Sequence, residues 1–143
     1  MSSAAEARFR VPAPASVARV VNVVALEPSC DDVLVRLSER SWKGVRFFPA
    51  AAVASRNREL VETISSGDLV VMVVAAGADA SAAAVIGRAC SDRRVHTAAF
   101  VLRDGSTADE ALSRTLAQVR PWSLMVVIAG DVGYVEDILR SFR

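Results

Sequence analysis

Five short apolar runs, each followed by a segment with helical periodicity, constrain the fold of this 143-residue chain more than any other feature. The runs predict β-strands at residues 20–26, 45–48, 69–74, 97–102 and 124–129. The central runs are continuously apolar rather than alternating, which is typical of parallel strands that helices cover on both faces. The pattern therefore predicts an α/β protein.

Five strand–helix units joined by right-handed crossovers predict a three-layer αβα sandwich with a doubly wound, five-stranded parallel sheet. The expected fold is Rossmann- or flavodoxin-like with strand order 2-1-3-4-5, and its ligand crevice lies at the carboxyl ends of strands one and three. Residues 1–17 contain mainly Ser, Ala, Pro and Arg without a period, and they predict a disordered or loosely packed arm. Residues 18–143 are expected to form a single α/β domain.

The composition excludes several classes of protein. A net charge of +1 argues against binding to nucleic acid. The longest apolar run, Leu69 to Ala76, is too short to span a membrane, and no apolar signal segment follows the N-terminus. The two cysteines do not make a disulfide framework. We therefore expect a cytoplasmic protein without nucleic-acid or membrane partners, and the Arg, Ala and Val usage is typical of a GC-rich bacterial genome.

Polar or small residues follow strands one and three at the predicted crevice. The candidate ligand-binding residues are Ser29, Cys30, Gly77, Asp79 and Ser81. A glycine allows close approach of a ligand to the backbone, and amides at helix N-termini can bind anions. Asp79 would favour a cation or an amine over a phosphate. No glycine-rich phosphate motif is present in the sequence, so we expect that nucleotides do not bind.

The sequence offers no catalytic constellation. The only histidine, His96, precedes strand four, and a six-residue strand would separate it from Cys30 by roughly 20 Å. Cys30 is interpreted as a buried structural thiol. Asp31, Asp79, Thr107 and Asp131 are interpreted as helix caps rather than metal ligands, and Thr107 with Glu110 predicts a capping box. We expect no catalytic residues, no metal and no cofactor, which argues against an enzyme.

Several segments are similar in order and pattern to the nucleotide-binding domain of the FtsZ/tubulin family. Residues 67–77 resemble the family's "GAD-apolar-AG" strand, residues 82–88 its following helix, and residues 124–131 its later strand ending in Asp. The family's glycine-rich phosphate loop is reduced here to residues 77–81, and its activation domain has no counterpart. The resemblance implies a nucleotide-binding fold that has lost GTP hydrolysis.

The chain also resembles response-regulator receiver domains, which share the order of five strand–helix units. Residues 68–73 are similar to their "DLVLMD" strand, but Val73 stands where the phospho-accepting aspartate belongs. Ala129 ends strand five, where receivers carry a lysine. This resemblance implies a pseudo-receiver signalling domain that acts by binding.

Together these observations favour a non-catalytic interaction or regulatory domain derived from a nucleotide-binding fold, with a second copy of the chain or another protein as its partner. Two alternatives stay open. One is a small-molecule or nucleotide-binding protein that uses the crevice after strands one and three. The other is the pseudo-receiver domain.

Overall fold

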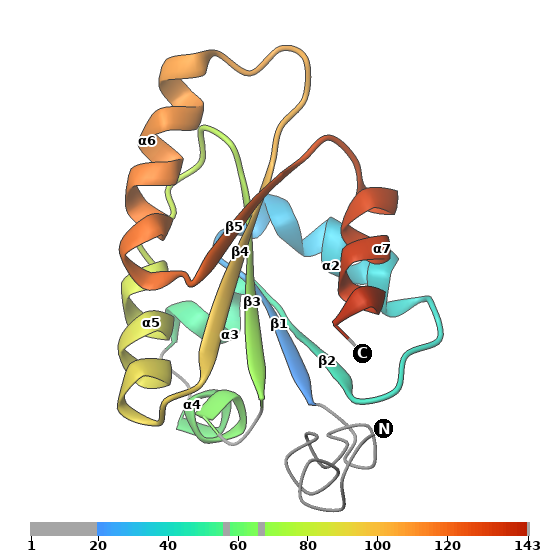
Figure 1. The fold of residues 1–143 in the computed structure, drawn as a ribbon, viewed down its shortest axis with the longest axis vertical. Helices are drawn as coiled ribbons and strands as arrows, with labels where there is room; N and C mark the ends of the chain where they lie inside the picture. Colours follow the sequence, from blue (N-terminus) through green and yellow to red (C-terminus); the bar gives the residue numbers. More distant parts are fainter. Residues whose placement is uncertain (1–19, 56–57, 66–67, 143) are drawn as a thin grey trace, which may run out of the picture.

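The computed structural model describes residues 20–55, 58–65 and 68–142. Its five strands form one all-parallel sheet in the order β2-β1-β3-β4-β5 (Figure 1), which confirms the predicted fold class and strand order. The strands are β1 Val21–Ala25, β2 Val45–Phe48, β3 Leu69–Ala75, β4 His96–Leu102 and β5 Met125–Ala129. The predicted N-terminal arm, residues 1–17, and a helix stop predicted at Gly67 lie outside the described residues.

Helices cover both faces of the sheet and make the three layers of the sandwich. They are η2 Pro28–Cys30, α2 Asp31–Ser38, α3 Ala50–Ala54, α4 Arg58–Ser65, α5 Ala83–Asp92, α6 Asp109–Val119, η3 Arg120–Trp122 and α7 Val132–Ser141. Figure 1 shows α5 and α6 on one side of the sheet and α2 and α7 on the other. Each side has its own cluster of buried aliphatic residues.

The central strand β3 explains why its sequence is apolar without alternation. Val70, Met72 and Val74 pack into the cluster beneath α4, α5 and α6. Val71 and Val73 point to the opposite face and pack into the cluster beneath α2 and α7. All five side chains are fully buried, because a parallel strand covered on both faces has no side exposed to water.

The starts of α2, α3 and α6 differ from the prediction. The cap predicted at Asp31 is wrong for α2, because the residue before that helix is Cys30 and no side chain caps it. The capping box at Thr107 is wrong, because the residue before α6 is Ala108 and no side chain caps this helix. The Thr107 hydroxyl instead bonds to the Asp104 carboxylate, at 3.3 Å, within the loop before α6. The helix α3 was not predicted; its first amide, at Ala50, donates to the Asp31 carboxylate at 2.9 Å.

The cap predicted at Asp131 is confirmed. The Asp131 carboxylate accepts a hydrogen bond from the Tyr134 amide at 2.8 Å and so begins α7. This satisfies one of the free amides in the first turn of the helix. Asp131 therefore fixes the point where the chain leaves β5 and turns into the last helix.

Candidate functional site

Two of the predicted site residues, Ser29 and Cys30, lie in a small polar group after β1. The Ser29 amide donates to the Glu27 carboxylate at 2.8 Å, and the Ser29 hydroxyl donates to the same carboxylate. The Cys30 thiol lies 3.1 Å from Glu27 Oε1. Glu27 therefore caps the short helix η2 by accepting from the Ser29 amide, and the same carboxylate also contacts the Ser29 hydroxyl and the Cys30 thiol.

The electrostatics of this group disfavour chemistry at sulfur. Burial, together with the hydrogen bond to Glu27 and its negative charge, raises the pKa of the Cys30 thiol far above its ordinary value. Burial also acts to raise the pKa of the Glu27 carboxyl, but hydrogen bonds from Ser29, Cys30 and the Ala75 backbone outweigh it and lower that pKa. Cys30 is thus a buried neutral thiol beside a carboxylate, a poor nucleophile.

The other three predicted residues, Gly77, Asp79 and Ser81, lie in the loop after β3. The backbone of this loop bonds to side chains of α6: the Gly77 amide donates to Thr115 Oγ1 at 2.9 Å and the Ala80 amide to Gln118 Oε1 at 2.7 Å. Two of the loop amides that could bind a phosphate are therefore already bonded within the protein.

Asp79 completes this second group. Its carboxylate accepts from the Ser81 amide and from Gln118 Nε2, each at 3.0 Å, and these bonds lower the pKa of the carboxyl. An open hollow of about 450 Å³ lies between the loop and α6, lined by Gly77, Ala78, Asp79, Arg114, Thr115, Ala117 and Gln118. The helix cap predicted at Asp79 is wrong, because the residue before α5 is Ala82 and no side chain caps this helix. The Asp79 carboxylate instead bonds to Ser81 within the turn before α5.

The structure thus divides the five predicted residues into two groups at the carboxyl edge of the sheet. Ser29 and Cys30 bond to Glu27, whereas Gly77 bonds to Thr115 and Asp79 bonds to Ser81 and Gln118. The Ala75 backbone at the end of β3 lies between the two groups, because it bonds to Glu27 and accepts from the Ala78 amide. The sequence pattern did not identify Thr115 and Gln118 as site residues. Both lie on α6, and only the fold brings that helix to the loop after β3. Within the described part of the chain, no three His, Cys, Asp or Glu side chains are arranged to hold a metal ion.

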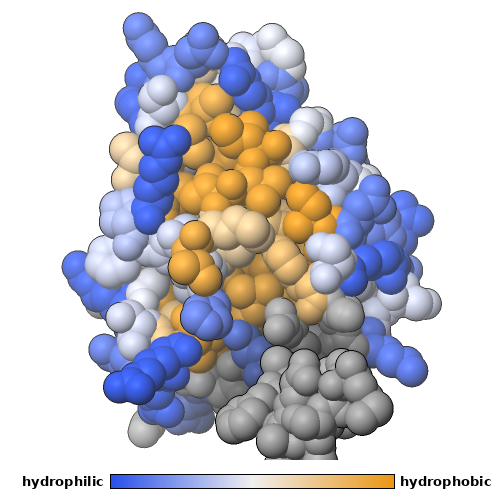
Figure 2. All heavy atoms as spheres, viewed as in Figure 1, coloured by the Kyte–Doolittle hydropathy of each residue, from blue (hydrophilic) through white to orange (hydrophobic). Residues whose placement is uncertain are grey.

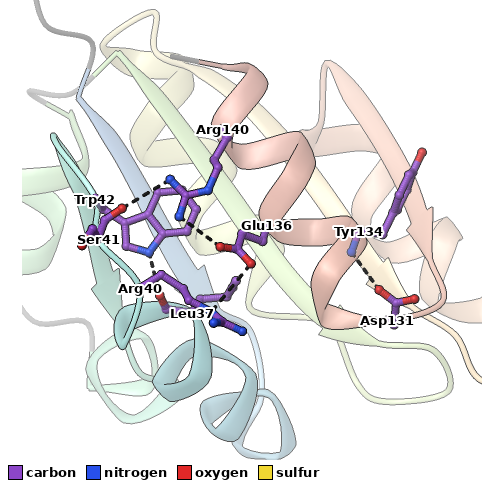
Figure 3. A network of polar contacts seen from close by, with 8 residues as sticks. All are labelled: Leu37, Arg40, Ser41, Trp42, Asp131, Tyr134, Glu136 and Arg140. Atoms are coloured by element: carbon purple, nitrogen blue, oxygen red, sulfur yellow. Dashed lines mark hydrogen bonds and ion pairs between the residues drawn. The ribbon is translucent and has the colours of Figure 1, made fainter.

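At the amino edge of the sheet, a network of polar contacts joins α7 to the loop before β2 (Figure 3). Arg140 lies over the ring of Trp42, with its guanidinium carbon 4.4 Å from the ring centroid, and it donates to Ser41 O at 3.3 Å. Glu136 pairs with Arg140 at 3.0 Å and with Arg40 at 3.7 Å. Arg40, Glu136 and Arg140 each have a partner within this network, which joins α7 to the segment between α2 and β2.

In contrast to this network, the outer edge of β5 carries apolar side chains that are exposed to solvent. Leu124 is 76% exposed, Ile128 47% and Met125 39%, and Val126 and Val127 between them are half-buried. We call residues 124–128 the β5 edge surface. Figure 2 shows a broad apolar area over the front of the molecule, where Figure 1 places β5 between α6 and α7.

Two features distinguish this surface from scattered apolar exposure. Its residues are consecutive, from Leu124 just before β5 to Ile128 within it, and β5 ends the sheet formed by the described residues, so within that part of the chain one side of its backbone has no neighbouring strand. Residues 124–129 include no charged residue and no proline, the usual means of protecting a sheet edge. No described helix combines the length and the apolar character needed to cross a lipid bilayer.

Comparison with known proteins leaves the site to be interpreted from its own geometry. No protein-family model matches the chain, and no curated protein matches it.

Proposed function

We propose that this chain is a non-catalytic, cytoplasmic interaction domain and that its binding surface is the β5 edge surface. The observation that carries the proposal is the exposure of the aliphatic side chains of Leu124, Met125 and Ile128, in and just before a strand whose outer backbone edge has no neighbouring strand among the described residues. Contiguous apolar exposure of this kind is typical of protein–protein contact sites. An unpaired edge adds backbone hydrogen bonds to the binding that such a surface can offer.

The carboxyl edge supports the small-molecule alternative less well. The amides of Gly77 and Ala80 are bonded to α6, and Cys30 is buried beside Glu27. A ligand there would have to displace bonds that the protein already makes. The hollow beside Asp79 is shallow and open, whereas ligand pockets usually enclose most of a ligand's surface.

The proposal includes an origin in a nucleotide-binding or receiver-like fold. The order 2-1-3-4-5 is that of flavodoxin-like proteins, a group that includes receiver domains, and it supports the pseudo-receiver alternative as a second candidate. Val73, at the position of the phospho-accepting aspartate in that resemblance, is fully buried in β3. Both candidates act by binding another molecule rather than by phosphotransfer.

The test is site-specific photo-crosslinking in cells of the native host. A photo-reactive benzoylphenylalanine at position 124 should give one discrete covalent protein adduct, which a second substitution, Ile128→Lys, should abolish. The matched control carries the same group at Val35, which is 55% exposed on α2, away from β5. Absence of an adduct from position 124, or the same adducts from both positions, would overturn the proposed function.

A further inference from the structure

We infer that the partner at the β5 edge surface is a second copy of this chain, with the two β5 strands paired antiparallel about a two-fold axis at Val127. The inference rests on the proposed function, because it names the partner of the same surface. The product is a dimer in which two five-stranded sheets join into one continuous ten-stranded sheet. A two-fold contact of this kind is closed, since the same patch serves on both copies.

The backbone register of β5 leaves the required groups free. The Arg103 amide donates to Ala129 O at 2.8 Å, and Val101 pairs with Ile128 in the β4–β5 register. Backbone groups of successive strand residues point to opposite sides, so Met125, Val127 and Ala129 direct theirs toward β4. Val126 and Ile128 direct theirs outward, to the side where no described residue forms a neighbouring strand.

This alternation fixes the pairing of an antiparallel partner. With Val127 on the axis, Val126 of each copy lies opposite Ile128 of the other. Each of these two pairs can exchange both of its N–H···O bonds, which gives four intermolecular hydrogen bonds. Val127 then faces its equivalent in the second copy as a non-hydrogen-bonded pair, where side chains approach most closely.

The side chains are also complementary in this register. Residues directly opposite in an antiparallel pair share one face of the sheet. On the α6 face, exposed Ile128 meets half-buried Val126, and Leu124 meets Gly130, where an added Cβ would find its nearest neighbour only at 4.0 Å. On the α7 face, Met125 meets the small residue Ala129. The most exposed apolar groups therefore lie against small or half-buried ones.

The charges at the two ends of β5 favour an antiparallel second copy over a parallel one. The segments that follow the carboxyl ends of β4 and β5, including the start of α6, contain four carboxylates and one guanidinium: Asp104, Asp109, Glu110, Asp131 and Arg103. The segments that lead into the amino ends of β4 and β5, which are the second half of α5 with the turn after it and η3, contain four guanidinium groups and one carboxylate: Arg88, Arg93, Arg94, Arg120 and Asp92. Antiparallel pairing brings the acidic end of each copy to the basic end of the other, whereas parallel pairing would bring like charges together.

The first test is the mass of the purified full-length protein by light scattering across a range of concentrations. We expect about twice the chain mass of 15.2 kDa, falling toward the monomer mass on dilution. Leu124→Lys and Ile128→Lys should each weaken the dimer at least tenfold, and circular dichroism should show that both variants remain folded. The matched control Val35→Lys should leave the dimer unchanged. A folded wild-type protein that stays monomeric at high concentration would overturn the inference.

The second test reads the register. A Val127→Cys variant should form an intermolecular disulfide on oxidation, because a non-hydrogen-bonded pair places the two Cα atoms about 4.5 Å apart, within disulfide range. The matched control Val126→Cys should not crosslink, since its equivalents would lie beyond the roughly 7 Å limit. The native thiols do not interfere, because Cys30 and Cys90 are buried. Crosslinking at position 126 and not at 127 would overturn this register.

Failure of the inference can be told apart from failure of the proposed function. A monomer in solution whose position 124 still gives a discrete adduct with a different protein in host cells rejects the second copy and keeps the interaction domain. A monomer that also gives no adduct rejects both. An adduct of twice the chain mass that contains only this chain supports both.

Discussion

At the residue scale, the structure leaves no room for one added carbon at Gly87. A Cβ there would lie 2.6 Å from both Cβ and a ring carbon of Trp122, so the ring would have to move. We expect Gly87→Ala to destabilise the protein by about 1–3 kcal/mol despite the better helix propensity of alanine, because overpacking outweighs propensity. Urea denaturation measures this change. Gly105→Ala is the control, since nothing lies within 4 Å of its added Cβ; equal losses in both variants would contradict the packing argument.

The two thiols give a second prediction at this scale. Burial raises the pKa of Cys90 to about 11, and burial with the Glu27 charge raises that of Cys30 further. The folded protein therefore keeps both thiols protonated at pH 8, and neither should react with a thiol reagent until the chain unfolds. The unfolded chain loses these protons near pH 8.5, so the stability they contribute is present below that pH and is lost as the pH rises above it. Rapid labelling of the native protein would refute this.

At the element scale, the caps of α6 and α7 differ in a way that a mutation pair can measure. Asp131→Ala removes the carboxylate that accepts from the Tyr134 amide, and we expect a loss of about 1 kcal/mol. Thr107→Ala should cost less than half as much, because Thr107 bonds within the loop and does not cap α6. Thermal unfolding of both variants provides the comparison. A larger loss at Thr107 would show that the loop bond, rather than the cap, controls helix formation.

The elements themselves could be predicted because their signals are local. The strand at 45–48 agrees residue for residue with β2, and the runs at 69–74 and 97–102 differ from β3 and β4 by one residue at one end. The five-residue helix α3 was missed because its start depends on Asp31, 19 residues earlier in the chain. The bonds from Thr115 and Gln118 to the loop after β3 span 38 residues, and no local pattern reports such a contact.

The exposure of the β5 edge surface could not be predicted from local sequence either. Residues 69–74 and 124–129 are both continuously apolar, yet β3 lies at the centre of the sheet and β5 at its edge. In β3 the pattern is explained by burial on both faces. In β5 it leaves Leu124 and Ile128 exposed, and the sequence could not separate these two outcomes because exposure depends on which strand has a neighbour on each side.

At the scale of the whole molecule, the bonded loop after β3 predicts indifference to nucleotides. A ligand at 100 times its dissociation constant would stabilise the fold by about 2.7 kcal/mol, or several degrees in a domain of this size. Because the Gly77 and Ala80 amides are already bonded to α6, we expect millimolar ATP or GTP to change the melting temperature by less than about 1 °C. Differential scanning fluorimetry measures this. A rise of several degrees in the melting temperature would support a nucleotide-binding site in the crevice.

The last prediction concerns how the stability of the molecule depends on its own concentration. Unfolding of a dimer releases two chains, so each tenfold rise in concentration stabilises the folded dimer by about 1.4 kcal/mol. Because the unfolding unit contains two chains of 143 residues, this should raise the melting temperature by about 2 °C per decade of concentration. Ile128→Lys should abolish the dependence, while Val35→Lys should retain the wild-type slope. A wild-type melting temperature that does not change with concentration would mean that the β5 edge stays open, because no contact between copies would be lost on unfolding.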